Sequence, residues 1–441
     1  MQRSCTLEFA YPFFRKGSVF MIKMKSLTRE RKFLLLALIP AYFIVAGLLL
    51  QPLEGILEGV YTMIREPDFL ITDYIAIGGI GAAFVNAGVM ALISIAIVYY
   101  LGMEMSGHTI TSCFLMFGFS LFGKNILNIW SIMMGVCLYA FYHKTSVTRY
   151  IYVGFYGTSL SPIITQLMTV GHLPLAVRLP LSILVGMIIG FVLPPLSTHT
   201  HYSHKGYSLY NVGFASGIIA TVIVSLMRSF GLQTEARLIW STGNDVLFAR
   251  LLLGLFGGMI LFSCLIAESV WKRYMEIWKT YGLSGTDYVK SEGFAPTLFN
   301  MGVNGIASTL IVLLVGGDLN GPTIGGIFTI VGFSATGKHL RNILPVMAGV
   351  ILGSFVKTWN ISDPSAMLAL LLSTTLAPIA GEFGVVAGVL AGFLHASVAL
   401  NVGIVYGGMN LYNNGFAGGI IAMFLVPVIQ SVRDRRARAR T

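Results

Sequence analysis

The sequence predicts an all-α, polytopic helical membrane protein with two homologous halves of about seven membrane elements each. Three observations support this fold class. First, 55% of the 441 residues are hydrophobic and 11% are charged, whereas soluble domains carry about 25% charged residues. Second, long apolar runs recur along the chain, as in membrane-spanning helices. These runs are continuous rather than alternating, which excludes an outer-membrane barrel. Third, the chain contains an internal repeat.

The repeat is visible without gaps over a long stretch. Residues 72–136 align with residues 286–350 at an offset of 214, and 25 of the 65 pairs are identical. Many identities fall on Gly, Asn, Asp, Lys and Thr, which shared apolar composition does not produce. The match resumes at an offset of 202, where Leu-Tyr-Asn-Val-Gly-Phe-Ala at 209–215 resembles Leu-Tyr-Asn-Asn-Gly-Phe-Ala at 411–417. The repeat predicts a duplicated ancestral unit.

The predicted organisation follows from the repeat. The first membrane repeat, 33–228, has expected elements near 33–51, 74–101, 107–122, 126–142, 150–168, 178–195 and 208–228. The second, 246–430, has expected elements near 246–268, 290–316, 321–336, 342–357, 365–380, 383–400 and 410–430. A basic N-terminal segment (1–32), an inter-repeat loop (229–245) and a basic C-terminal tail (431–441) complete the chain.

Charge placement predicts how the halves lie in the membrane. Seven crossings per half would invert the second half relative to the first. The loop 52–70 is rich in acidic residues, whereas the equivalent loop 269–289 is rich in basic residues. Opposite charge in equivalent loops favours inverted repeats under the positive-inside rule. Parallel repeats remain an alternative if one short segment is re-entrant. The net charge of +11 gathers at the two ends, so we expect an inner-membrane protein of a prokaryote with cytoplasmic termini and no nucleic-acid partner.

Two short glycine-rich segments, 107–124 and 321–338, are the main candidates for a solute site. A helix of about 14 residues covers only about 21 Å, short of the roughly 30 Å hydrocarbon core. Paired interrupted segments in two halves are typical of a transporter's binding site, and helix N-termini there would face the cavity. The expected solute-binding residues are Thr109, Ser120, Lys124 and Asn128 with their counterparts Thr323, Ser334, Lys338 and Asn342. The alternatives are closely packed short helices and lysines that reach the headgroups.

Further polar residues repeat between the halves. Asn86 and Asn300 lie within the second element of each half, and Asn211 and Asn413 open the last element. Paired amides suit a polar solute or an ion, and the alternative is hydrogen bonding between helices. Three acidic residues, Glu104, Asp318 and Glu382, are candidates for ion coupling, although Glu382 could equally lie in a loop.

The sequence contains no enzyme signature, and we expect no cofactor and no metal. The pattern Gly332 to Gly337-Lys338 has Walker spacing, but His339 stands where Ser or Thr is required. The histidines at 199, 201 and 204 could bind a metal, but they have no counterpart in the second half. A solvated loop is the expected reading of that cluster.

Two blocks carry a resemblance. From about residue 30 onward, the Gly-Phe-Ser-x-x-Gly-Lys and Leu-Tyr-Asn-x-Gly-Phe-Ala blocks resemble an uncharacterised family of prokaryotic polytopic membrane proteins, labelled as a domain of unknown function. The Tyr-Asn-x-Gly tract is also similar to a repeated segment of urea channels, which are inverted repeats. The Leu-Pro-x-x-Thr signature expected of those channels is absent, so this likeness implies architecture alone.

These observations favour a secondary carrier for a small polar or anionic solute, bound between the two glycine-rich segments. The alternatives are an uncoupled channel for a small neutral solute or ion, and a membrane enzyme acting on lipid, for which the sequence offers no acid–base or nucleophile pair. The expected partners are the solute and membrane lipids. Whether the chain forms a homo-oligomer stays open.

Overall fold

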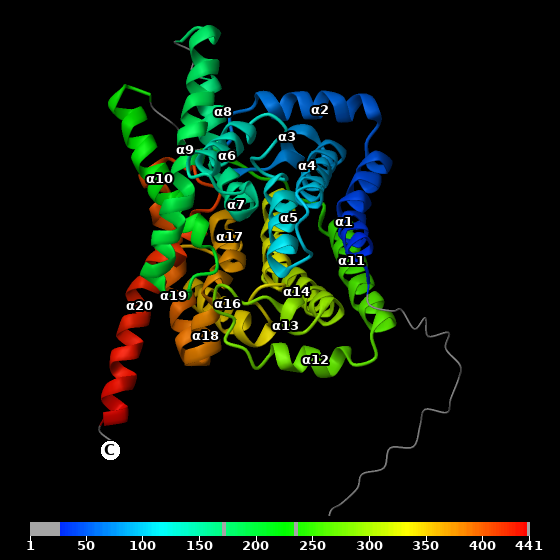
Figure 1. Ribbon diagram of the computed structural model, residues 1–441, viewed down its shortest axis with the longest axis vertical. Helices are drawn as coiled ribbons and strands as arrows, with labels where there is room; N and C mark the ends of the chain where they lie inside the picture. The colour runs from blue at the N-terminus through cyan, green and yellow to red at the C-terminus, as the bar shows by residue number, and fades with distance from the viewer. Residues whose placement is uncertain (1–26, 170–172, 233–236, 439–441) are drawn as a thin grey trace, which may run out of the picture.

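The protein is a bundle of helices, most of which run from one end of the molecule toward the other (Figure 1). The computed structural model describes residues 27–169, 173–232 and 237–438. Among these, nine helical stretches are long and apolar enough to cross a membrane. Most of the expected N-terminal segment (1–26), part of the inter-repeat loop (233–236) and the last residues of the tail (439–441) lie outside the described residues. The chain is therefore a multi-pass helical protein, as its composition predicted.

The helices of the first half match the expected order with one addition, α2, and the expected element 74–101 is divided into α3 and α4. They are α1 (Arg29–Leu50), α2 (Leu53–Arg65), α3 (Tyr74–Gly78), α4 (Ile80–Tyr100), α5 (Gly107–Phe119), α6 (Trp130–Tyr142), α7 (Ile151–Gly157), α8 (Ser161–Thr169), α9 (Leu175–His204) and α10 (Asn211–Ser229), with short 3-10 turns at Val147–Arg149 and Thr158–Leu160.

The second half repeats this order. It contains α11 (Asp245–Ile266), α12 (Val270–Ile277), α13 (Tyr288–Ser291), α14 (Phe294–Leu314), α15 (Gly321–Phe333), α16 (Leu340–Ser354), α17 (Pro364–Leu372), α18 (Ala377–Phe383), α19 (Val385–Val402) and α20 (Asn413–Arg438), with 3-10 turns at Ser373–Leu376 and Gly403–Tyr406. In the described residues the strands are β1 (Ile71–Thr72) and β2 (Leu238–Ile239), which pair in parallel.

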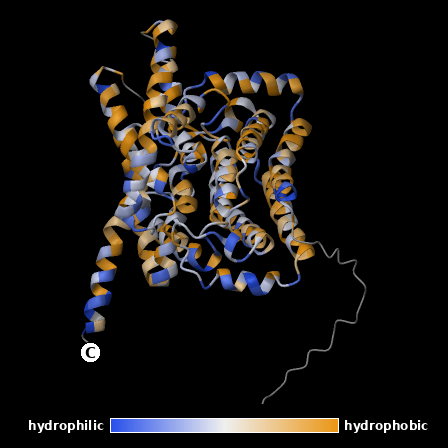
Figure 2. Ribbon diagram, viewed as in Figure 1, coloured by the Kyte–Doolittle hydropathy of each residue, from blue (hydrophilic) through white to orange (hydrophobic). Residues whose placement is uncertain are grey.

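Equivalent helices of the two halves lie at opposite ends of the bundle. Figure 1 shows α2 across one end and its counterpart α12 across the other, so α1 runs toward one end and α11 toward the opposite one. The two long helices meet where the Tyr42 hydroxyl donates to the carbonyl of Leu251 at 3.2 Å. Figure 2 shows hydrophobic residues along α1, α9 and α11, and hydrophilic residues on α12 and at the end of α20.

Helices α5 and α15 pack against each other in antiparallel fashion at the centre. A Cβ atom on Gly118 would lie 2.9 Å from the Gly325 carbonyl oxygen, and one on Gly107 would lie 2.3 Å from that of Ala335. Phe117 and Phe328 add a ring contact with centroids 4.5 Å apart. Glycine lets the two backbones touch. The space expected between the two glycine-rich segments is therefore filled by the segments themselves.

Each half caps the short helix of the other half. Asp73 Oδ1 accepts from the backbone N–H of Gly321 at 3.2 Å, and its counterpart Asp287 accepts from Gly107 at 2.9 Å. Capping boxes close the same turns, from Ser106 to Thr109 and from Asn320 to Thr323. These N-termini are consequently bonded to protein acceptors, which differs from the expectation that they open into a cavity.

Two of the expected continuous spans are broken. The stretch expected at 150–168 forms α7, a 3-10 turn and α8, and the one at 365–380 forms α17, a 3-10 turn and α18. At these breaks the carbonyls of Ser159 and Thr375 accept the N–H groups of Leu411 and Leu209, each from the other half, at 3.0 Å. The breaks therefore join the halves at the points where α10 and α20 begin, because backbone freed from a helix needs a partner inside a membrane.

Candidate functional site

The two lysines of the glycine-rich segments are fully buried. Lys338 Nζ donates to Thr374 Oγ1 at 2.7 Å and to the Tyr210 hydroxyl, and lies 4.5 Å from the centre of the Tyr210 ring. Lys124 Nζ donates to the Phe155 carbonyl at 3.2 Å. Among the described residues, no ion pair involves either lysine. Both ammonium groups are thus enclosed by neutral groups rather than by headgroups.

Backbone conformation holds each lysine in place. After α5 and α15 the chain turns through Gly123 and Gly337, whose φ angles of 124° and 145° are ones that side-chain-bearing residues rarely adopt. Asn86 Nδ2 donates to the carbonyls of Ser120 and Lys124 at 2.7 and 2.9 Å. Asn86 therefore stabilises the turn that leads to Lys124.

The second half uses the same arrangement. Asn300 Nδ2 donates to the carbonyls of Ser334 and Lys338, both at 2.8 Å. The neighbouring Asn304 donates to Ser334 Oγ at 2.6 Å. The amide nitrogens of Asn86 and Asn300 are accordingly engaged by backbone, whereas the Asn300 carbonyl oxygen is buried without a hydrogen-bond partner.

The other repeated asparagines also bond to the protein. Asn342 Nδ2 donates to the Gly337 carbonyl at 2.9 Å, and Asn128 Nδ2 donates to Asp68 Oδ2 at 3.0 Å. Asn211 Nδ2 donates to the Ser197 carbonyl at 2.7 Å and its counterpart Asn413 to that of Ala399 at 2.8 Å. Of these asparagines, Asn211 also lines the central cavity described next.

A cavity of about 150 Å³ lies between the two halves, beside the starts of α10 and α20. Its walls combine residues that are far apart in the sequence: His108 from α5, Tyr156 from α7, Tyr210 and Tyr412 before α10 and α20, and Phe333 and Thr336 after α15. Lys338 lies directly behind Tyr210 and Phe333. We call this space the central cavity.

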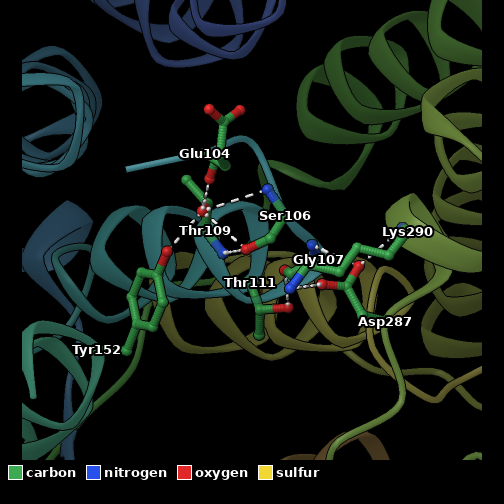
Figure 3. A network of polar contacts seen from close by, with 8 residues as sticks. All are labelled: Glu104, Ser106, Gly107, Thr109, Thr111, Tyr152, Asp287 and Lys290. Carbon is green, nitrogen blue, oxygen red and sulfur yellow. Dashed lines mark hydrogen bonds and ion pairs between the residues drawn. The ribbon is translucent and has the colours of Figure 1, made fainter. Parts of the chain in front are cut away.

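A second, wider space of about 470 Å³ lies next to it and is called the vestibule. Arg149, Lys290, Tyr152 and Glu104 line it, and His108 lines both spaces. Figure 3 shows how Thr109 organises this entrance: its hydroxyl contacts that of Tyr152 at 2.6 Å and donates to the Glu104 carbonyl at 2.9 Å.

The counterpart Thr323 makes the matching bond to the Asp318 carbonyl at 2.8 Å. It closes the turn before α15 as Thr109 closes the turn before α5. Neither threonine lies in the central cavity.

The three acidic candidates for ion coupling lie apart from one another. Glu104 is exposed at the vestibule. Asp318 accepts from Trp240 Nε1 at 2.9 Å. Glu382 accepts from the Tyr207 hydroxyl at 2.6 Å and pairs with Arg433 at 3.8 Å. None of the three lines the central cavity.

The structure also identifies residues that were not candidates. Asp68 is fully buried and accepts from Tyr74, Asn128 and Thr165. Tyr210 and Tyr412 stand in the repeated Leu-Tyr-Asn block, directly before the candidate asparagines Asn211 and Asn413. Repetition of the tyrosine was the signal that could have found this pair.

The residues of the other half that correspond to the wall of the central cavity differ in size. By the repeat, Phe333, Thr336 and Ser284 correspond to Phe119, Phe122 and Leu70. Phe119 and Phe122 are buried, and a Cβ atom on Gly325 would lie 2.4 Å from Phe122 Cε1. Larger apolar side chains therefore occupy the positions of Thr336 and Ser284 on the α2 side.

The histidines at 199, 201 and 204 lie in helix α9. Within the part of the chain that the structure describes, no three His, Cys, Asp or Glu side chains are grouped closely enough to hold a metal ion. Of the histidine cluster, His204 Nε2 contacts Asn211 Oδ1 at 2.9 Å. It lies in the last turn of α9 rather than in the loop expected from the sequence.

Comparisons with known proteins agree with the repeat. Residues 53–229 and 266–431 match the family described as "Protein of unknown function (DUF1576)". Neither the curated proteins nor the solved structures give a match. The two matched regions cover more than half of the chain, so this multi-pass helical protein belongs to the DUF1576 family.

Proposed function

We propose that this protein is a secondary carrier, a membrane transporter that moves a small polar or anionic solute through the central cavity between two inverted repeats. The observation that supports this most is the position of the cavity. It lies where α10 and α20 begin, beside α7 in the broken element of the first half. Binding sites of transporters lie at such repeat interfaces, near interrupted helices.

The difference between the two sides supports a carrier over an open pore. The cavity contacts the vestibule on the α12 side, while Phe122 and Leu411 close the equivalent path on the α2 side. A carrier exposes its site to one side at a time, and repeats of opposite orientation can exchange their shapes to expose it to the other. In this proposal Phe122 and Leu70 move when the α2 side opens.

We also propose that the α12 end faces the cytoplasm of a prokaryote. Lys272, Arg273 and Lys279 lie in or beside α12, and α1 begins at the same end with Arg29. The α2 segment instead carries Glu54 and Glu58. Basic residues mark cytoplasmic ends, so both termini would be cytoplasmic.

Exchange in proteoliposomes tests this function. Protein is reconstituted, the vesicles are preloaded with unlabelled chloride, acetate or benzoate, and entry of the same labelled solute is measured. We expect preloading to accelerate entry of at least one solute, and we expect Thr336→Phe, which fills the cavity, to abolish that acceleration. Entry that is equal in preloaded and empty vesicles would show a channel instead. Entry that is equal in protein-free liposomes would contradict transport of these solutes.

A further inference from the structure

Four aromatic rings, those of Tyr156, Tyr210, Phe333 and Tyr412, form one part of the wall of the central cavity. Tyr156 and Phe333 stack with centroids 6.3 Å apart, and Tyr210 lies 4.7 Å from Phe333 and 5.7 Å from Tyr412. An inorganic ion would lose its hydration here and find few donors in exchange, which costs several kcal/mol. Ring faces instead suit a flat apolar body. A cavity of about 150 Å³ holds one benzene-sized ring.

A basic side chain lies behind this aromatic wall. Lys338 is fully buried, and its described bonds go to the neutral hydroxyls of Tyr210 and Thr374. Tyr210 accepts that bond and also lines the central cavity. An incoming anion would stabilise the protonated form of a buried lysine that has no carboxylate beside it. Tyr210 therefore connects Lys338 to the cavity.

The approach to the cavity also favours anions. Arg149 and Lys290 line the vestibule, and His108 stands where the two spaces meet. Glu104 is the acidic residue in that wall, and Asp287 pairs with Lys290 at 3.9 Å. Basic side chains around a narrow entrance raise the local concentration of anionic solutes.

We propose that the solute is a small monocarboxylate with a planar apolar body, its ring held among Tyr156, Tyr210 and Phe333 and its carboxylate directed to the hydroxyl of Tyr210. This assignment rests on the proposed function, because it names the solute of the same cavity. Benzoate is the simplest probe of the class. Benzamide has the same ring without the charge, and inorganic phosphate has the charge without the ring.

Calorimetric binding to the purified protein in detergent tests the assignment. We expect benzoate to bind, and benzamide and phosphate to bind at least tenfold more weakly. Equal binding of benzoate and benzamide would overturn the role of the charge. Binding of phosphate in preference to benzoate would overturn the role of the ring. No binding of benzoate would overturn the class.

Substitutions in and behind the wall test whether benzoate binds in the central cavity. Lys338→Met and Lys124→Met each remove a buried lysine, so they are matched in structural cost, and we expect only Lys338→Met to abolish benzoate binding. If Lys338→Met does not fold, Tyr210→Phe keeps the ring and is expected to weaken binding at least tenfold. Unchanged binding in Tyr210→Phe would refute the proposed contact.

The outcome separates this assignment from the carrier proposal. Acceleration of chloride or acetate exchange without benzoate binding would refute the monocarboxylate and leave the carrier standing. Benzoate binding without exchange of benzoate in either direction would refute the carrier and leave the binding site standing.

Discussion

Lys338 of the second half donates to the hydroxyl of Tyr210 of the first half, whereas the equivalent pair, Lys124 and Tyr412, is not formed. Lys124 bonds instead to the Phe155 carbonyl, and the Tyr412 hydroxyl is buried without a hydrogen-bond partner. Both tyrosines line the central cavity, and the two equivalent Lys–Tyr pairs differ. For the proposed carrier we expect the pairs to be alternatives, of which one forms in each state.

The two tyrosines therefore predict opposite effects of one substitution. Tyr412→Phe removes a buried hydroxyl that has no partner, so stability should stay unchanged or rise by about 1 kcal/mol. Tyr210→Phe removes an acceptor from the buried Lys338 and should cost about 1–3 kcal/mol. Thermal melts of the purified variants in detergent measure both. A larger loss in Tyr412→Phe than in Tyr210→Phe would contradict the asymmetry.

Close contact between α5 and α15 limits the size of the side chains that can replace the glycines between them. Alanine at Gly325 would place its Cβ 2.6 Å from the Gly118 carbonyl oxygen and 2.4 Å from Phe122. Gly325→Ala should therefore destabilise the protein by about 1–3 kcal/mol, since the backbones cannot separate without loss of packing. Gly254→Ala is the control, because no atom lies within 4 Å of its Cβ position. Equal melting temperatures of the two variants would argue against the close packing.

The repeated amides are expected to act on the fold. Asn300→Ala leaves the carbonyls of Ser334 and Lys338 without their donor, and a buried unsatisfied group costs about 1–3 kcal/mol. Asn86→Ala should behave alike. Asn401→Ala removes an exposed amide bonded to the Ser397 carbonyl and should change stability by less than about 0.5 kcal/mol. Comparable melting of all three variants would refute this scaffolding role.

Asp68, in the connection between α2 and α3, predicts a pH dependence of stability. Burial raises its pKa from 3.8 to about 7, against the opposing bonds from Tyr74, Thr165 and Asn128, and the charge of Glu66 raises it further. The fold thus favours the protonated acid. The stabilisation is present below the ordinary pKa and is lost as pH rises through about 7.

The melting temperature of the wild type should accordingly fall between about pH 4 and about pH 7 and level off at higher pH. Asp68→Asn stays neutral throughout and should remove most of that fall, measured in the same detergent and buffers. An identical fall in Asp68→Asn and wild type would assign the dependence to other groups. The same linkage predicts that acid favours the closed α2 side, where Asp68 is buried.

Much of the architecture could be predicted because it depends on local patterns in the sequence. The repeat and the short helices follow from glycines, apolar runs and paired polar residues. The burial of Lys124 and Lys338 does not follow from these patterns, which fit lysines at the headgroups equally well. The site could be predicted only in part. Asn86 and Asn300 repeat because their amides fasten the backbone before each lysine, a role that sequence alone does not distinguish from solute binding.

The central cavity could not be located from the sequence. It depends on Tyr210 and Phe333, which come from different halves, and on the size of side chains at equivalent positions such as Thr336 and Phe122. The glycines that suggested a space between α5 and α15 instead allow direct contact. Displacement of the cavity to the side of these helices is a consequence of packing in three dimensions.

Labelling of single cysteines at Ser284 and Leu70 tests the carrier account most directly, since these equivalent positions lie on the α12 and α2 sides. The background protein has all four native cysteines replaced, Cys5, Cys137 and Cys264 by serine and the buried Cys113 by alanine. With an impermeant maleimide we predict that Ser284→Cys reacts from the α12 side while Leu70→Cys is protected, and that a transported solute on the α2 side reverses the pattern. Reaction of both positions at once, or of neither under any condition, would contradict alternating access.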